Sequence, residues 1–155
     1  MTEPTEAAAG GALPSAFDPA AFMRMTRRYG HGAAVGIRYD AHGADWVQLA
    51  FDWKPDLVGE PATGVIASGP ILTLMDTATS MAIWAKLDRF IPQATLDLRV
   101  DYLRPATPHR TVIGRGQCYR VTRSIAFVRG QAHDGDPADP IAHVVGTFMF
   151  LEDRG

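Results

Sequence analysis

The residue best placed to do chemistry is Asp76, a carboxylate inside the otherwise apolar stretch of residues 71–87. Burying an unpaired carboxylate costs free energy, so such a group is usually either paired or used. Ser68 and Gly69 come shortly before it, where the free N–H groups of a helix start attract negative charge. Because Pro70 has no N–H, Ser68 and Gly69 are the main donors there. This pattern predicts a carboxylate that is either paired or used in chemistry, and amides at a helix start that can stabilise an oxyanion.

The same stretch predicts the longest helix of the chain. Ser68 suits the N-cap and Pro70 the first turn, and residues 71–87 contain neither Gly nor Pro. Apolar side chains occupy nearly every side, so we expect this helix to be packed inside the protein. On position alone, Asp76 could equally face a polar seam and hydrogen-bond the neighbouring backbone.

The flanking segments predict one short helix and six strands. Asp18 and Pro19 favour a helix start, so residues 17–28 predict an amphipathic helix that Gly30 and Gly32 end. Alternating apolar residues predict strands at 35–39, 46–53, 95–103, 111–122, 124–132 and 141–151. In the third of these, strict alternation puts Thr95 on the polar face with Asp97. We expect an α+β fold in which a curled antiparallel sheet of about six strands wraps around the long helix.

The spacing of the chemical groups predicts an assembly. Asp76 is seven residues beyond Gly69, which along one helix is about 10 Å. Groups that act on one carbonyl must lie near 3 Å from it. If both act on the same carbonyl, the carboxylate and the amides must therefore come from different subunits.

Three motifs together carry a family resemblance. They are Gly-Val-Ile-x-Ser-Gly-x-x-x-x-Leu-x-Asp over residues 64–76, Ala-Thr-Leu-Asp-Leu over 94–98 and Tyr-Leu-Arg-Pro-Ala over 102–106. The chain resembles the hotdog-fold thioesterases of the PaaI-like, 4-hydroxybenzoyl-CoA thioesterase-related family, over roughly residues 35–151. The resemblance implies a hotdog fold, and a site at a dimer interface that is often part of a homotetramer.

The resemblance also implies roles for single residues. Asp76 matches the catalytic carboxylate, as nucleophile or general base, and the Ser68 and Gly69 amides match those that polarise the thioester carbonyl. Thr95 matches a Ser or Thr that orients the water or the carboxylate, although a β-branched strand residue is an equal reading. The chain departs from the family where many relatives have Asn and His, because Pro61 and Ala67 stand there.

Coenzyme A carries phosphates that arginine recognises by charge and geometry. Arg104, Arg120, Arg123 and Ser124 fall where relatives tend to meet the cofactor tail, which makes them candidate substrate-binding residues. Each arginine alone is also typical of an ordinary surface. Met75, Trp84 and Phe90 hint at an apolar acyl pocket, but core packing explains them more simply.

Composition limits the other function classes. The chain has 155 residues, a formal charge of −2 and 21% charged residues, so we expect one domain without a nucleic-acid-binding face. Residues 1–16 predict a disordered tail and residues 17–155 the single domain. The start lacks a signal-peptide pattern and the long helix carries Asp76, which favours a cytoplasmic protein that does not span a membrane. The single cysteine, Cys118, is expected in the core, and no histidine spacing indicates a metal site.

The sequence therefore predicts an acyl-CoA thioesterase without a metal or redox cofactor, working as at least a homodimer and, by resemblance, as a homotetramer. Coenzyme A enters only as part of the substrate. One alternative is a non-catalytic protein that binds acyl-CoA or an aromatic ligand on the same scaffold, which the absent His and Asn keep open. A hydratase or dehydratase ranks last, because it would need a histidine paired with an acid.

Overall fold

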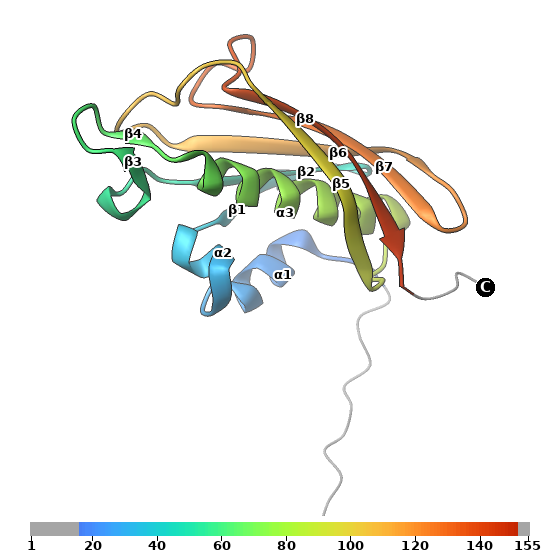
Figure 1. The fold of residues 1–155 in the computed structure, drawn as a ribbon. Helices are drawn as coiled ribbons and strands as arrows, with labels where there is room; N and C mark the ends of the chain where they lie inside the picture. Colours follow the sequence, from blue (N-terminus) through green and yellow to red (C-terminus); the bar gives the residue numbers. More distant parts are fainter. Residues whose placement is uncertain (1–15, 152–155) are drawn as a thin grey trace, which may run out of the picture.

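The computed structural model describes residues 16–151, in which a curved sheet covers one long helix (Figure 1). The sheet is antiparallel, with strand order β1-β2-β6-β7-β8-β5. Its strands are β1 (Arg38–His42), β2 (Trp46–Phe51), β5 (Gln93–Tyr102), β6 (Val112–Val121), β7 (Ile125–His133) and β8 (Ala142–Phe150). The predicted α+β architecture of six strands around a helix is confirmed.

The central helix, α3 (Ser68–Leu87), begins one residue earlier than predicted, because Ala67 rather than Ser68 is the N-cap and Ser68 is the first helical residue. It fits closely against the sheet because β6 offers glycines beneath it. A Cβ at Gly116 would lie 2.5 Å from the backbone nitrogen of Thr79, closer than any packed side chain allows. The apolar side of α3 is fully buried here, including Leu74, Met75 and Ala78. Glycine in β6 is therefore what lets the sheet wrap around the helix.

Two short helices lie on the opposite side of α3 from the sheet (Figure 1). The first, α1 (Pro19–Thr26), is capped as predicted by Asp18, whose carboxylate accepts from the Ala21 amide at 3.1 Å. The second, α2 (Gly30–Val35), was not predicted. We expected Gly30 and Gly32 to end the first helix and a strand to begin at residue 35. That prediction was wrong, since residues 30–35 are helical; Lys54 donates to the Ala34 carbonyl near the end of α2, a contact between residues 20 positions apart that local sequence does not reveal. Gly36, with φ of 88°, then ends the helix.

A small ribbon leads into α3. It consists of a 3-10 turn, η1 (Pro55–Leu57), and the antiparallel strands β3 (Val58–Glu60) and β4 (Val65–Ile66). The indole nitrogen of Trp53 donates to the Gly64 carbonyl at 2.8 Å and so holds the turn of this ribbon in place. The ribbon fixes the direction from which the chain enters the helix.

Two expectations concern the rest of the chain. The predicted tail, residues 1–16, lies outside the described residues except for Ala16. Among residues 16–151, no helix is long and apolar enough to cross a membrane.

Candidate active site

Asp76 lies on the one side of α3 that the sheet does not seal. Residues on this side are half-buried or exposed, whereas their helical neighbours are buried. They form a mainly polar stripe along the helix: Gly69, Leu72, Thr73, Asp76, Thr77 and Ser80. The carboxylate thus sits in a polar seam, which was one of the two readings that the sequence left open, rather than in the middle of an apolar surface.

Strand β5 supplies the partner of this carboxylate. The Thr95 hydroxyl donates to Asp76 Oδ1 at 2.9 Å. A second contact joins the same two elements. The side-chain amide of Gln93 on β5 donates to the carbonyl and the hydroxyl of Ser80, which lies four residues after Asp76 on α3, both at 2.9 Å. Two polar links therefore join β5 to the open side of α3.

A β-bulge makes the Thr95 contact possible. Thr95 pairs with the buried Phe148, whereas Asp97 pairs with the neighbouring Thr147, so the extra residue Leu96 is left out of the register. Because residues paired across a sheet share a face, Thr95 points toward α3 and Asp97 away from it. The prediction that Thr95 shares a face with Asp97 was therefore wrong, since alternation with a period of two fails at a bulge.

The start of α3 offers free backbone donors. Ser68 and Gly69 are exposed, and the Ala67 N-cap provides no side-chain acceptor. Among residues 16–151, no hydrogen bond is made by the amide of either residue, as expected in a first helical turn. A Cβ built on Gly69 meets nothing within 4 Å, so the space beside its amide is open.

The tip of β5 also contacts this helix start. The Tyr102 hydroxyl donates to the Ser68 carbonyl at 3.3 Å. Beside them is a hollow of about 440 Å³ that Ser68 and Tyr102 help to line. Arg104 also lines it, and the rest of its lining is apolar: Val65, Ile66, Ile71, Leu103, Pro105 and Ala106. A polar helix start thus opens onto an apolar hollow.

One polar residue near the site, His31, was missed by sequence reasoning. His31 belongs to α2, and its Nε2 lies 3.0 Å from the Thr73 hydroxyl, one turn before Asp76 on α3. That hydroxyl donates its single hydrogen to the Gly69 carbonyl at 3.0 Å, so Nε2 is the donor toward Thr73. Because the contact joins residues 42 positions apart, no local pattern could have indicated it.

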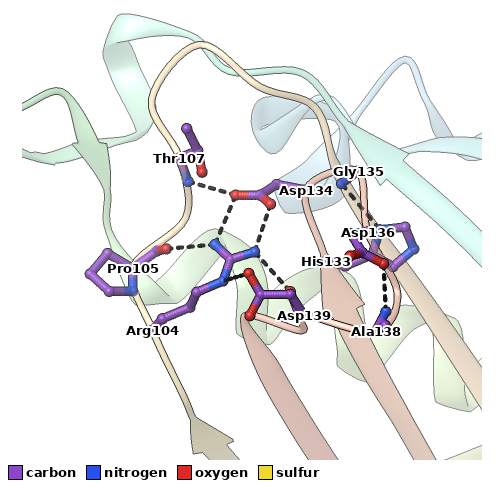
Figure 2. A network of polar contacts seen from close by, with 9 residues as sticks. All are labelled: Arg104, Pro105, Thr107, His133, Asp134, Gly135, Asp136, Ala138 and Asp139. Atoms are coloured by element: carbon purple, nitrogen blue, oxygen red, sulfur yellow. Dashed lines mark hydrogen bonds and ion pairs between the residues drawn. The ribbon is translucent and has the colours of Figure 1, made fainter.

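Arg104, a predicted phosphate ligand, is engaged within the protein (Figure 2). Its two terminal nitrogens donate to the two carboxylate oxygens of Asp134 at 2.8 and 3.1 Å. Nε lies 3.1 Å from Asp139 Oδ2, and the Asp139 and Pro105 carbonyls accept the remaining donors shown. Hydrogen bonds from Arg104 hold the pKa of the buried Asp134 well below its ordinary value. The network clamps the β7–β8 loop onto the segment after β5.

The other predicted cofactor ligands lie far from Arg104 within one chain. Arg120, Arg123 and Ser124 are exposed around the β6–β7 turn, and the Ser124 carbonyl accepts from the Phe150 amide. Arg104 lies just after β5 and near the start of β8, whereas the β6–β7 turn lies near the end of β8. The two ends of β8 are about 25 Å apart at the rise of a strand. The structure does not bring the four predicted ligands together in one chain.

Three residues considered for a pocket belong to the core or its edge. Met75 is fully buried, and the Trp84 indole donates to the Ile91 carbonyl at 2.7 Å while its ring packs 4.6 Å from that of Phe90. Cys118 is also fully buried, and burial raises the pKa of its thiol to about 11. The simpler core reading holds for Met75, Trp84 and Cys118.

Comparisons with known proteins give a consistent result. The family model described as the thioesterase superfamily matches residues 63–141. A crystal structure of a Pseudomonas aeruginosa protein is 40% identical, with a TM-score of 0.73, and the match covers 84% of this chain and 94% of that one. The medium/long-chain acyl-CoA thioesterase YigI of Escherichia coli K12 is 27% identical over 136 residues, which is 75% of this chain and 82% of YigI. The E. coli PaaI structure, at 14% identity, shares the fold with a TM-score of 0.72, over 86% of this chain and 92% of PaaI.

Proposed function

We propose that this chain, which belongs to the thioesterase superfamily and is a thioester hydrolase, cleaves an acyl-CoA into a free acid and coenzyme A. Asp76 is the proposed catalytic carboxylate. The expected hotdog thioesterase family and fold are thereby confirmed. The mechanism, the substrate and the assembly form the proposal.

The observation that carries the mechanism is the hydrogen bond from Thr95 to Asp76. It occupies Oδ1 and fixes the plane of the carboxylate, so that Oδ2 can face a substrate. Oδ2 either attacks the thioester carbonyl, giving an anhydride that water hydrolyses, or takes a proton from the water that attacks. In both routes the thiolate of coenzyme A leaves and is protonated.

The amides of Ser68 and Gly69 are the proposed oxyanion donors. Attack places negative charge on the carbonyl oxygen, and two N–H groups at a helix start stabilise that charge by hydrogen bonding and by the helix dipole. The absence of the family His and Asn leaves these amides as the main electrostatic aid. They lie about 10 Å from Asp76 along the same helix, so they serve the Asp76 of another subunit.

Strand β5 suggests how two subunits share the site. It lies at one end of the strand order, and within residues 16–151 nothing pairs with its outer edge. If two copies of β5 pair antiparallel about a two-fold axis, the Thr95 end of one meets the Tyr102 end of the other. Since Thr95 is bonded to Asp76 and Tyr102 to Ser68, that pairing brings the carboxylate of one subunit toward the amides of its partner. A homotetramer would be a pair of such dimers.

The acyl group of the proposed substrate is apolar. The hollow beside Ser68 has an apolar lining that suits a hydrocarbon chain, and the relative YigI is named for medium- and long-chain acyl-CoA. Arg120, Arg123 and Ser124 remain candidate ligands of the coenzyme A phosphates. Arg104 is left out of this proposal because Asp134 and Asp139 already engage its guanidinium.

The test is release of free thiol from short, medium, long and aromatic acyl-CoAs by wild type and Asp76→Asn. We expect turnover of the medium or long class, and a loss of about 100-fold or more in kcat in the variant. The rival is a binding protein, because Pro61 and Ala67 replace two polar groups of the family site. It predicts that acyl-CoA raises the melting temperature without any thiol release.

A further inference from the structure

We propose that Tyr102 is a positioning residue for the oxyanion donor of Gly69. This inference rests on the proposed function, which makes that amide part of the site. It concerns the hydrogen bond of 3.3 Å that the Tyr102 hydroxyl donates to the Ser68 carbonyl.

The chemistry of the peptide unit carries the argument. The carbonyl oxygen of Ser68 and the N–H of Gly69 belong to one planar peptide group, so fixing the oxygen also fixes the direction of the N–H. A donor on the carbonyl polarises the group and strengthens the N–H as a donor, because linked hydrogen bonds reinforce one another. The Tyr102 hydroxyl therefore acts on the Gly69 N–H through the peptide plane rather than by donating to the thioester carbonyl itself.

The surroundings of this peptide agree with such a role. The peptide begins a helix whose N-cap, Ala67, offers no side-chain acceptor, so no capping bond occupies the N–H groups of the first turn. The space beside Gly69 is open to a ligand, and Tyr102 lines the same hollow as Ser68. In a helix the Ser68 carbonyl also accepts from the amide four residues on, so the phenol adds a second donor, from β5, that holds this peptide group more firmly.

The other reading is that Tyr102 merely docks the end of β5 onto α3. The two readings differ in what they change. Docking would alter the melting temperature and the binding of every ligand, whereas positioning an oxyanion donor stabilises the transition state and alters kcat. An alkyl-CoA thioether separates them, since it has the chain and the coenzyme but no carbonyl.

The experiment compares Tyr102→Phe with the matched control Tyr119→Phe. Both tyrosines are 47% exposed, and Tyr119 lies on β6 under Arg129, away from the helix start. We expect Tyr102→Phe to lower kcat by about 2- to 10-fold, the loss typical of one neutral hydrogen bond, with KM unchanged. Its melting temperature and its Kd for the thioether should match those of the control.

Two results would overturn the inference while leaving the proposed function intact. One is a kcat equal to that of Tyr119→Phe in a protein whose wild type turns over acyl-CoA. The other is a loss of kcat matched by equal losses in thioether affinity and melting temperature. If the wild type itself releases no thiol from any acyl-CoA, the proposed function fails and the inference falls with it.

Discussion

Thr95 donates a hydrogen bond of 2.9 Å to Asp76, across 19 residues of sequence and across the seam between β5 and α3. Both residues had been singled out as candidates, but strict strand alternation placed Thr95 on the same face as Asp97. The bulge at Leu96 brings them together.

Removing the Thr95 hydroxyl should slow turnover. Thr95→Val keeps the shape of the side chain but leaves Asp76 without its donor, and hydrogen bonds to charged groups contribute about 1.5–3 kcal/mol. We expect kcat to fall by about tenfold or more, and Thr95→Ser, which retains the hydroxyl, to stay near wild type. Steady-state kinetics on the best acyl-CoA measures both. Equal rates for the valine and serine variants would remove Thr95 from the mechanism.

The close approach of helix and sheet predicts a stability effect away from the site. Gly116→Ala places a methyl group 2.5 Å from the Thr79 nitrogen, where the neighbour is helix backbone and cannot turn aside. Overpacking of this kind costs about 1–3 kcal/mol. Thermal unfolding should show a lower melting temperature, whereas Gly69→Ala, which meets open space, should show little change. An unchanged melting temperature for Gly116→Ala would contradict the packing described.

The Arg104–Asp134 pair predicts a pH-dependent stability. Because the folded pKa of Asp134 is lowered, its contribution is fully present above about pH 4, where an unfolded aspartate is ionised, and is lost as pH falls toward the folded value. Asp134→Asn should therefore destabilise the protein strongly at pH 7 and progressively less below pH 4. Denaturant unfolding of both proteins across this range measures the difference.

Asp101→Asn is the matched control for that experiment. It also breaks an arginine pair, but the Arg99 and Asp101 side chains are 69% and 49% exposed, so the pair contributes little. Asp134 is 3% exposed by the same measure. If the two variants lose equal stability at pH 7, the Asp134 network is not the clamp that its geometry indicates.

Cys118 should be unreactive in the folded protein. Its thiol is fully buried, and its pKa of about 11 keeps it protonated at the pH of an assay. A disulfide reagent that reports free thiols should therefore detect none in native protein and one per chain in guanidinium chloride. Rapid labelling of the native protein would show that the strand opens readily.

The sequence was sufficient for elements whose signals are local and regular. Residues 71–87 contain no helix breaker and are followed by Asp88, the left-handed C-cap, so the helix end agrees with prediction. The predicted strands at 124–132 and 141–151 correspond to β7 and β8. The carboxylate in an apolar helix was likewise visible without a structure, because charge in such a place is conspicuous.

What the sequence could not provide depends on residues distant along the chain. The partner of Arg104 is 30 residues away, so a buried clamp looked like a possible phosphate ligand. The bulge that turns Thr95 inward depends on pairing with β8, and α2 depends on Lys54 and on the contact between His31 and Thr73. Periodicity describes a strand or helix by itself, whereas these features arise when elements meet.

In the proposed mechanism, Asp76 of one subunit acts on a thioester held by the Ser68 and Gly69 amides of another subunit. Two inactive variants test it directly: Asp76→Asn, and Gly69→Leu, whose side chain fills the open space beside the amide. Each alone should be inactive on acyl-CoA. In a mixed dimer, one of the two sites combines an intact Asp76 with an intact Gly69.

The measurement is thiol release after the two variants are co-expressed or unfolded and refolded together. Random assortment makes half of the dimers mixed, with one working site of two, so we expect about a quarter of wild-type activity. The unmixed variants, treated in the same way, should stay inactive. A mixture as inactive as its parents, with mixed dimers shown to be present, would contradict a site shared between subunits.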